Sequence, residues 1–282
     1  MADHNEQLRR QQIGSMTAKG GFINEENICE KFLNFREDVD AQKWLRLMSY
    51  QPAMVKEMSA VQIPVRIARS RAKEFGVLDE NFVETVRFKK ADIQLKFLYD
   101  DVWHVENISL KKANSSAGFN QIDKRPVLTY QKIWGFDDDL AKWLRLFTGD
   151  ILPKEILSET ELSEIKDKKQ RRLYLNEIPE EKFARIVQFF ESNLNQVVSD
   201  IIGGRGEFAA DRFLVTRKTG EESVDWILKD IDVVCTFYAE GGVKMSPRGS
   251  LRIGRITVQR KGGTPDPTSL QFKINPLHLF ED

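Results

Sequence analysis

The segment 92–112, which reads DIQLKFLYDDVWHVENISLKK, constrains the fold of this chain more than any other. Apolar residues occupy every second position from Ile93 to Phe97, with polar residues between them, as in a strand that has one buried face. A pair of aspartates then interrupts the pattern, and a second strand-like run returns. The segment therefore predicts a β-hairpin. Because a hairpin is at best marginally stable alone, the rest of the chain must supply further strands and covering helices.

The segments around the hairpin supply these elements. We predict helices at 24–37, 40–50, 137–149, 179–202 and 230–239 from their apolar spacing and their end signals. We also interpret 58–77 as a helix or helix pair broken near Pro64, 120–134 as a helix, and 151–175 as a linker. Strand-like runs follow at 212–218, 224–230, 251–261 and 269–275. The pattern predicts an α/β fold with a central mixed β-sheet flanked by helices.

Composition excludes several classes of protein. With 282 residues, 41% of them hydrophobic and 18 of them Phe, the chain can bury a sizeable core. No apolar run approaches the length of a membrane span, so we expect a soluble protein without a membrane partner. The two cysteines, Cys29 and Cys235, are far apart, and the three histidines are scattered. A zinc site and a Ser-His-Asp triad are therefore not expected.

The charges are balanced overall but unevenly distributed. The chain has 43 basic and 43 acidic residues. The stretch from Lys244 to Lys273, however, contains seven basic residues and only one acidic residue, Asp266. A second basic cluster spans 166–172. Acidic residues concentrate elsewhere. This distribution is compatible with a DNA-binding face on a protein of zero net charge.

The hairpin also carries residues suited to phosphodiester hydrolysis. That reaction commonly uses a divalent cation, which takes oxygen ligands, together with a lysine near the attacking water. Asp92 begins the first strand, while Ser109 and Lys111 lie two residues apart on the second and so share a face. The pattern is short and common in chains of this length. Gln94 and Lys96 form another pair of the same kind.

Several longer blocks carry a family resemblance. They are TAKGGFINEE near the N-terminus, KKANSSAGFNQIDK after the hairpin, GGRGEFAADRFLV, and SPRGSLRIGRITVQRKGG followed by LQFKINPLHLF. In this order, from about residue 13 to the last residue, they resemble the type II restriction endonucleases of the PD-(D/E)XK superfamily. The similarity is strongest to the HinP1I-like four-base cutters, which cleave GCGC. It implies a PD-(D/E)XK core and a single domain over 1–282, with a catalytic hairpin at about 90–112 and a basic DNA-recognition part at about 203–282.

The resemblance also implies site residues. Asp92 matches the family's metal-binding aspartate and Lys111 its active-site lysine. Ser109 falls where the relatives have a glutamine in place of the superfamily's acid, and Glu25 falls where the superfamily often has a helix glutamate. The expected catalytic residues are thus these four, with Asp92, Ser109 and Glu25 holding Mg²⁺. Because serine is short and neutral, Glu106 remains an alternative second ligand.

Recognition of a GC-rich palindrome is also implied, either GCGC or two GC half-sites separated by one base pair. Arg and Lys donate to guanine in the major groove, and Asn and Gln can donate or accept. We expect base contacts first from Gln121, Lys124, Gln259 and Lys261, with further DNA contacts from Asn120, Asp123, Arg205, Arg248 and Arg260. Alternation places Gln259 and Lys261 on one face of their strand and Arg260 on the other.

The expected function is Mg²⁺-dependent cleavage of double-stranded DNA by a type II restriction endonuclease in the bacterial cytoplasm, paired with a cognate DNA methyltransferase. Two alternatives stay open. Serine at position 109 is compatible with a DNA-binding module without catalysis, and the same fold serves structure-selective repair nucleases and resolvases. The sequence also leaves open whether the protein acts as a monomer or as a homodimer.

Overall fold

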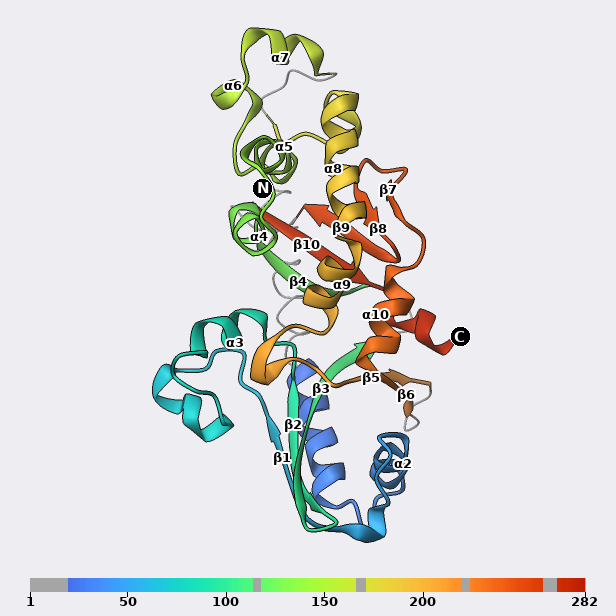
Figure 1. The fold of residues 1–282 in the computed structure, drawn as a ribbon. Coiled ribbons are helices and arrows are strands. Elements are labelled where there is room, and N and C mark those ends of the chain that lie inside the picture. The colour runs from blue at the N-terminus through green and yellow to red at the C-terminus, as the bar shows by residue number, and fades with distance from the viewer. Residues whose placement is uncertain (1–19, 114–117, 166–170, 220–223, 261–267, 282) are drawn as a thin grey trace, which may run out of the picture. The chain divides into compact units, whose positions relative to one another are not determined.

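The computed structural model describes residues 20–113, 118–165, 171–219, 224–260 and 268–281 (Figure 1). The chain forms two compact units. Unit 1 contains Phe119–Ile201 and Thr236–Asn275, and unit 2 contains the described residues of Gly14–Gly118, Ile202–Cys235 and Pro276–Asp282. The predicted catalytic hairpin lies in unit 2, whereas the predicted DNA-recognition part at about 203–282 contributes to both units. The single-domain organisation stays a prediction.

Unit 2 is built on a five-stranded sheet in the order β1-β2-β3-β5-β6. Its strands are β1 (Val55–Gln62), β2 (Ile93–Tyr99), β3 (Val102–Ala113), β5 (Arg212–Lys218) and β6 (Val224–Asp230). Only the β3–β5 pair is parallel, so the sheet is mixed. The predicted hairpin is confirmed as β2 and β3. Asp100 and Asp101 close it with φ angles of 49° and 63°, as in the type I′ turns that suit twisted strands.

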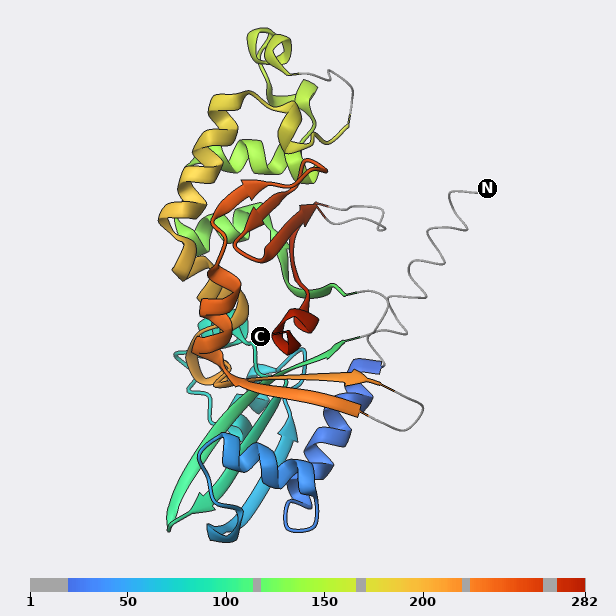
Figure 2. The ribbon, with the colours of Figure 1, turned by 90° about the vertical axis from the view of Figure 1, so that its right-hand side faces the viewer.

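The apolar face of this sheet is covered by the N-terminal helices (Figure 2). Ile93, Leu95 and Phe97 are fully buried, as the alternation predicts. They belong to one cluster with Phe32, from the helix over residues 20–33, and Trp44, from α2 (Val39–Leu47). Asp38 caps α2, since its side chain accepts a 2.8 Å hydrogen bond from the Ala41 amide.

The interpretation of 58–77 as helical is wrong for its first part. Val55–Gln62 is the strand β1, which pairs antiparallel with β2 along its whole length. Its partner is about forty residues away in sequence, so the pairing that stabilises it has no local signature. Beyond Pro64 the chain forms a short 3₁₀-helix, η2 (Arg69–Phe75), and then α3 (Phe82–Phe88).

Unit 1 contains a second, antiparallel sheet in the order β4-β10-β9-β8-β7, which the sequence did not indicate as separate. Its strands are β4 (Asn120–Pro126), β7 (Val243–Met245), β8 (Leu251–Ile253), β9 (Ile256–Arg260) and β10 (Ser269–Ile274). Helices α4 (Val127–Trp134), α5 (Asp138–Thr148) and α8 (Glu180–Ser192) contact this sheet and cover one face of it (Figure 2). Phe272 of β10 is fully buried, with ring-centroid distances of 5.1 Å to Tyr130 and 5.8 Å to Trp134.

The helical elements of the second half of the chain largely follow their end signals. They are α4 (Val127–Trp134), α5 (Asp138–Thr148), α6 (Pro153–Ile156), α7 (Glu159–Glu164), α8 (Glu180–Ser192), α9 (Leu194–Ile202) and α10 (Ile231–Ala239), with 3₁₀ turns η3 (Leu175–Glu177), η4 (Gly206–Phe208) and η5 (Pro276–Phe280). No helix in the described ranges is long and apolar enough to cross a membrane.

Two further expectations need correction. The predicted helix over 120–134 starts only at Val127, because Pro126 disfavours the helical conformation in the residue before it and Asn120–Pro126 pairs as β4. The expected linker at 151–175 contains the two short helices α6 and α7. The α/β class, with a mixed sheet flanked by helices, is confirmed.

Candidate active site

The site begins at Asp92, which directly precedes β2. One of its carboxylate oxygens, Oδ2, accepts three hydrogen bonds from β3: from the Leu110 amide at 2.7 Å, from Lys111 Nζ at 3.1 Å and from Ser109 Oγ at 3.4 Å. The structure thus brings together the three residues of the hairpin that the sequence singles out. The antiparallel register fixes this arrangement, since Ile93 lies opposite Ile108.

Lys111 is held in place from two sides. Besides its ion pair with Asp92, its ammonium donates to the Leu110 carbonyl at 2.9 Å. The Lys111 side chain is 16% exposed, so most of its surface is shielded from solvent. Ser109, two residues earlier on the same face, is 1% exposed. The period-2 geometry of β3 therefore places a hydroxyl and an ammonium beside one carboxylate.

Glu25 joins the site from the helix over residues 20–33. The pKa of Glu25 is raised to about 7, first by burial and then by the negative charge of Asp92, while the positive charges of Lys111 and Lys89 act in the opposite direction. The two carboxylates therefore repel each other in a partly desolvated environment. A bound cation would relieve that repulsion.

The donor set fits a hard divalent cation such as Mg²⁺, because it consists of two carboxylates and a hydroxyl, all oxygen ligands. Mg²⁺ also retains several waters and so needs few protein ligands. Within the described ranges, no three His, Cys, Asp or Glu side chains are grouped so as to hold a metal ion.

Lys89 is a further member of the candidate site, and it was not predicted from the sequence. It follows α3, and its ammonium donates to the carbonyls of Ile63 at 3.3 Å and Pro64 at 2.8 Å. Burial lowers the pKa of Lys89, while Asp92 and Glu25 raise it. Lys89 and Asp92 do not lie on one strand, so strand alternation could not have linked them. The only sequence signal for Lys89 as a site residue is its position three residues before Asp92.

Glu106 lies on the other face of β3 from Ser109 and Lys111. It is 5% exposed and accepts hydrogen bonds from the Tyr50 hydroxyl at 2.8 Å and from Arg212 Nε at 3.0 Å. These partners satisfy the buried carboxylate. The geometry therefore favours Ser109 over Glu106 as the second ligand beside Asp92.

Three of the predicted base-contacting residues share one face of the second sheet. Gln271 of β10 pairs with Lys124 of β4 on one side and with Gln259 of β9 on the other. Gln121 pairs with Lys273, because a register shift in the β4–β10 ladder leaves Ile122 without an opposite residue. This bulge turns Gln121 and Lys124 to the same face, although residues three apart in a regular strand point to opposite faces.

Two other predicted DNA contacts, Asp123 and Arg260, make intramolecular contacts that the structure describes. Asp123 is 8% exposed, accepts a 2.9 Å bond from Arg125 Nε and a 2.5 Å bond from the Tyr130 hydroxyl, and pairs with Phe272 of the buried face. Arg260 donates to the carbonyls of Arg172 and Leu173 and stacks over a tyrosine ring at 3.6 Å.

The remaining predicted contacts are dispersed. Asn120 begins β4, Arg248 is exposed in the connection between β7 and β8, and Arg205 of unit 2 lies over the ring of Phe88 at 4.6 Å. Lys261 lies outside the described residues.

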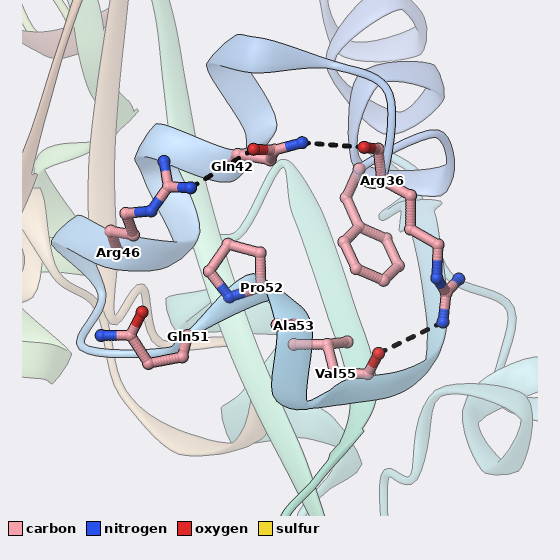
Figure 3. Close-up of a pocket in the computed structure, with 8 residues that line it drawn as sticks. Arg36, Gln42, Arg46, Gln51, Pro52, Ala53 and Val55 are labelled. Carbon is pink, nitrogen blue, oxygen red and sulfur yellow. Dashed lines mark hydrogen bonds between the residues drawn. The ribbon is translucent and has the colours of Figure 1, made fainter.

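A pocket in unit 2 is separate from the site (Figure 3). Arg36, Gln42 and Arg46 line it, and the Arg36 guanidinium donates to the carbonyls of Val55 and Lys56. Gln42 in turn donates to the Arg36 carbonyl at 2.8 Å. None of Glu25, Asp92, Ser109 or Lys111 lines this pocket.

Comparison with known proteins agrees with the geometry of the hairpin. The model of the R.HinP1I restriction endonuclease family matches residues 82–280. No curated protein sequence matches significantly. Among solved structures, the restriction endonuclease MspI in complex with its cognate DNA matches with a TM-score of 0.58 and 16% identity, over 93% of this chain and 92% of that one. This likeness shows a restriction-endonuclease fold. The family match spans the catalytic hairpin and the whole second sheet, so the chain belongs to the R.HinP1I restriction endonuclease family and is a type II site-specific deoxyribonuclease.

Proposed function

We propose that this enzyme uses Mg²⁺ to hydrolyse both strands of duplex DNA at a short GC-rich palindrome. The target is GCGC or a pair of GC half-sites separated by one base pair. The observation that carries the catalytic part is the convergence of Ser109 and Lys111 on Asp92 within a chain of this family. Duplex DNA as the substrate is supported by the MspI structure, which was solved with cognate DNA.

Asp92, Ser109 and Glu25 would hold the metal. The three described hydrogen bonds to the Asp92 carboxylate all end on Oδ2, so Oδ1 is the oxygen that Asp92 offers to a cation. Glu25 would bind as a carboxylate, since the charge of a cation favours its ionised form. When bound, Mg²⁺ supplies activation of water and neutralisation of the charge that develops on the phosphate.

Lys111 has the role of the active-site lysine. Its ammonium, held by Asp92 and the Leu110 carbonyl, has a third hydrogen to donate. That hydrogen orients the attacking water or a phosphate oxygen as negative charge develops on it. Lys89 adds a second positive charge to the same site, and its two carbonyl partners fix its position.

Recognition belongs to the polar face of the second sheet in this proposal. Gln121, Lys124 and Gln259 donate to guanine, and Lys261 continues their strand. Arg205, Arg248 and Asn120 contribute phosphate or groove contacts. Asp123 and Arg260, which are engaged within unit 1, stabilise the sheet that presents these residues.

A cognate DNA methyltransferase is the expected functional partner, because a host must protect its own copies of the target. A palindromic site also suits a two-fold symmetric homodimer. The stoichiometry of the protein–DNA complex, measured by light scattering, distinguishes a homodimer from a monomer that cuts the strands one after the other.

The test is digestion of a sequenced plasmid with Mg²⁺ and with EDTA, beside Lys111→Ala, followed by sequencing of the ends. The proposal expects discrete Mg²⁺-dependent fragments that share one GC palindrome and are absent with the variant. Ends without a common sequence, or cutting confined to junctions, would overturn the proposed specificity. Undiminished cutting in EDTA would overturn the metal requirement.

A further inference from the structure

Gln271, which was not among the residues predicted to contact DNA, lies at the centre of the proposed recognition face. It is on β10, between β4 and β9, and its register neighbours are Lys124 and Gln259. The opposite face of β10 is buried through Leu270 and Phe272. Gln271 is thus surrounded by proposed base contacts and held on a strand that the core fixes.

A single hydrogen bond links Gln271 to Gln121. The Gln271 amide nitrogen donates to Gln121 Oε1 at 2.6 Å. Lys124 lies opposite Gln271 in the β4–β10 ladder, so a cation lies beside the Gln271 side chain on the same face of the sheet. With its oxygen engaged, Gln121 offers its NH₂ group, which carries two donors, for an outside partner.

The polarity of Gln121 has a consequence for base recognition. A free glutamine pairs with adenine, because its oxygen accepts from N6 while its nitrogen donates to N7. The bond from Gln271 takes one of the two lone pairs of this oxygen and directs the oxygen toward β10, which disfavours the paired contact with adenine and weakens the acceptor that cytosine N4 requires. Donation to acceptors is favoured instead, and guanine presents two of them, O6 and N7, in the major groove.

We propose that Gln271 is a positioning residue that fixes Gln121 as a hydrogen-bond donor and thereby makes Gln121 selective for guanine. The inference rests on the proposed function, namely that this face reads a GC-rich site. It extends that proposal by naming the residue that sets the polarity of one base contact.

The test uses three variants of the full chain. Gln271→Glu replaces the donor with an acceptor, so the Gln121 amide should reverse and present its oxygen. Gln271→Met removes the hydrogen bond at similar size. Gln188→Glu, on the exposed surface of α8 in the same unit, is the charge-matched control. Binding in EDTA and cleavage in Mg²⁺ are measured on the target duplex and on duplexes with one symmetric base-pair change at each position.

For Gln271→Glu we expect preference for guanine to fall roughly tenfold at one symmetric pair of positions and to stay unchanged at the others. Gln271→Met should relax the same position by less, and Gln188→Glu should change nothing. In a Gln121→Ala background, Gln271→Glu should have no further position-specific effect, because the group that it orients is gone.

Other outcomes overturn the inference. Equal weakening on every duplex would mean that the new charge merely repels DNA. A position-specific loss that persists without Gln121 would mean that Gln271 contacts a base itself. Unchanged preference in a folded Gln271→Met variant, checked by circular dichroism, would show that the hydrogen bond orients nothing of consequence. Failure of the proposed function is distinguishable, since the unmodified enzyme would then show no preference among the duplexes.

Discussion

The carboxylate of Asp92 accepts a 2.7 Å hydrogen bond from the backbone amide of Leu110, on the strand beside it. This bond aligns the proposed metal ligand against the part of β3 that carries Ser109 and Lys111. A backbone donor cannot rotate away, so the carboxylate keeps its orientation when the solvent or the charge nearby changes. The candidate active site is in this respect preorganised.

Asp92→Asn removes the negative charge of this residue but keeps an oxygen that can accept the hydrogen bond from the Leu110 amide. Asparagine can still accept from the Leu110 amide through its side-chain oxygen, so the thermal stability should change little. Without the negative charge, however, metal binding weakens, and we expect the cleavage rate to fall by at least about 100-fold. Melting temperature and plasmid cleavage measure the two effects separately. A variant that unfolds would show that the charge, through Lys111, is mainly structural.

Ser109→Ala tests the hydroxyl that stands where the superfamily has an acid. The side chain is buried and its hydroxyl lies 3.4 Å from Asp92 Oδ2, so alanine fits without a clash. If Ser109 holds the metal, half-maximal cleavage should require severalfold more Mg²⁺, while the sequence of the cut site stays the same. An unchanged Mg²⁺ dependence would remove Ser109 from the ligand set.

Glu25 predicts an unusual pH dependence for the metal-free protein. Its pKa in the folded state is raised to about 7 from an ordinary 4.5. A raised carboxyl pKa means that the folded state holds a proton that the unfolded state has already released. Stability is therefore expected to fall as pH rises from about 4.5 to about 7 and to level off above it.

The size of this effect is on the order of 1–2 kcal/mol after allowance for partial solvent exposure. Chemical denaturation in EDTA across this pH range measures it. Glu25→Gln should remove the slope that Glu25 contributes and make the metal-free protein more stable at pH 8. Mg²⁺ should stabilise the unmodified enzyme at pH 8 and stabilise the variant less. A variant with the same pH slope as the unmodified protein would contradict the assignment.

The parts of this structure that were predictable follow short-range patterns. The alternation of β2 and β3 placed Ser109 and Lys111 on one face, and the register then brought them to Asp92. What was missed depends on contacts distant in sequence. The strand β1 is stabilised by its pairing with β2. Lys89 is held at the site by hydrogen bonds to the carbonyls of Ile63 and Pro64. Local spacing carries no record of such contacts.

The bulge in β4 is the clearest example of this limit on the recognition face. In a regular strand, Gln121 and Lys124 would point to opposite faces, and only in a helix would their spacing place them on one face. The structure instead has a strand with one extra residue, Ile122. This bulge forms against the partner strand β10. The sequence thus predicted the two residues as DNA contacts, but it did not indicate the bulge that places them on one face of the sheet.

Lys273 combines a position on the proposed recognition face with a lowered pKa. It pairs with Gln121 and Thr257 on the polar face of β10, and burial lowers its pKa. A lowered lysine pKa means that carrying the charge is less favourable in the folded state than in the unfolded one. The charge therefore costs stability at neutral pH, and that cost disappears only as pH rises through the folded-state pKa.

Lys273→Gln should accordingly raise the melting temperature at neutral pH and also weaken DNA binding, because the same charge faces the proposed substrate. If the ammonium contacts a phosphate, the slope of log K against log salt concentration should fall by about one in magnitude. If it contacts a base, the sequence preference at one position of the target should weaken instead. Lys132→Gln, on the exposed surface of α4, is the matched control and should leave both quantities unchanged. Thermal melts and salt-dependent binding isotherms supply the measurements. A stabilised variant with undiminished affinity would mean that Lys273 is a buried cation without a role in DNA recognition.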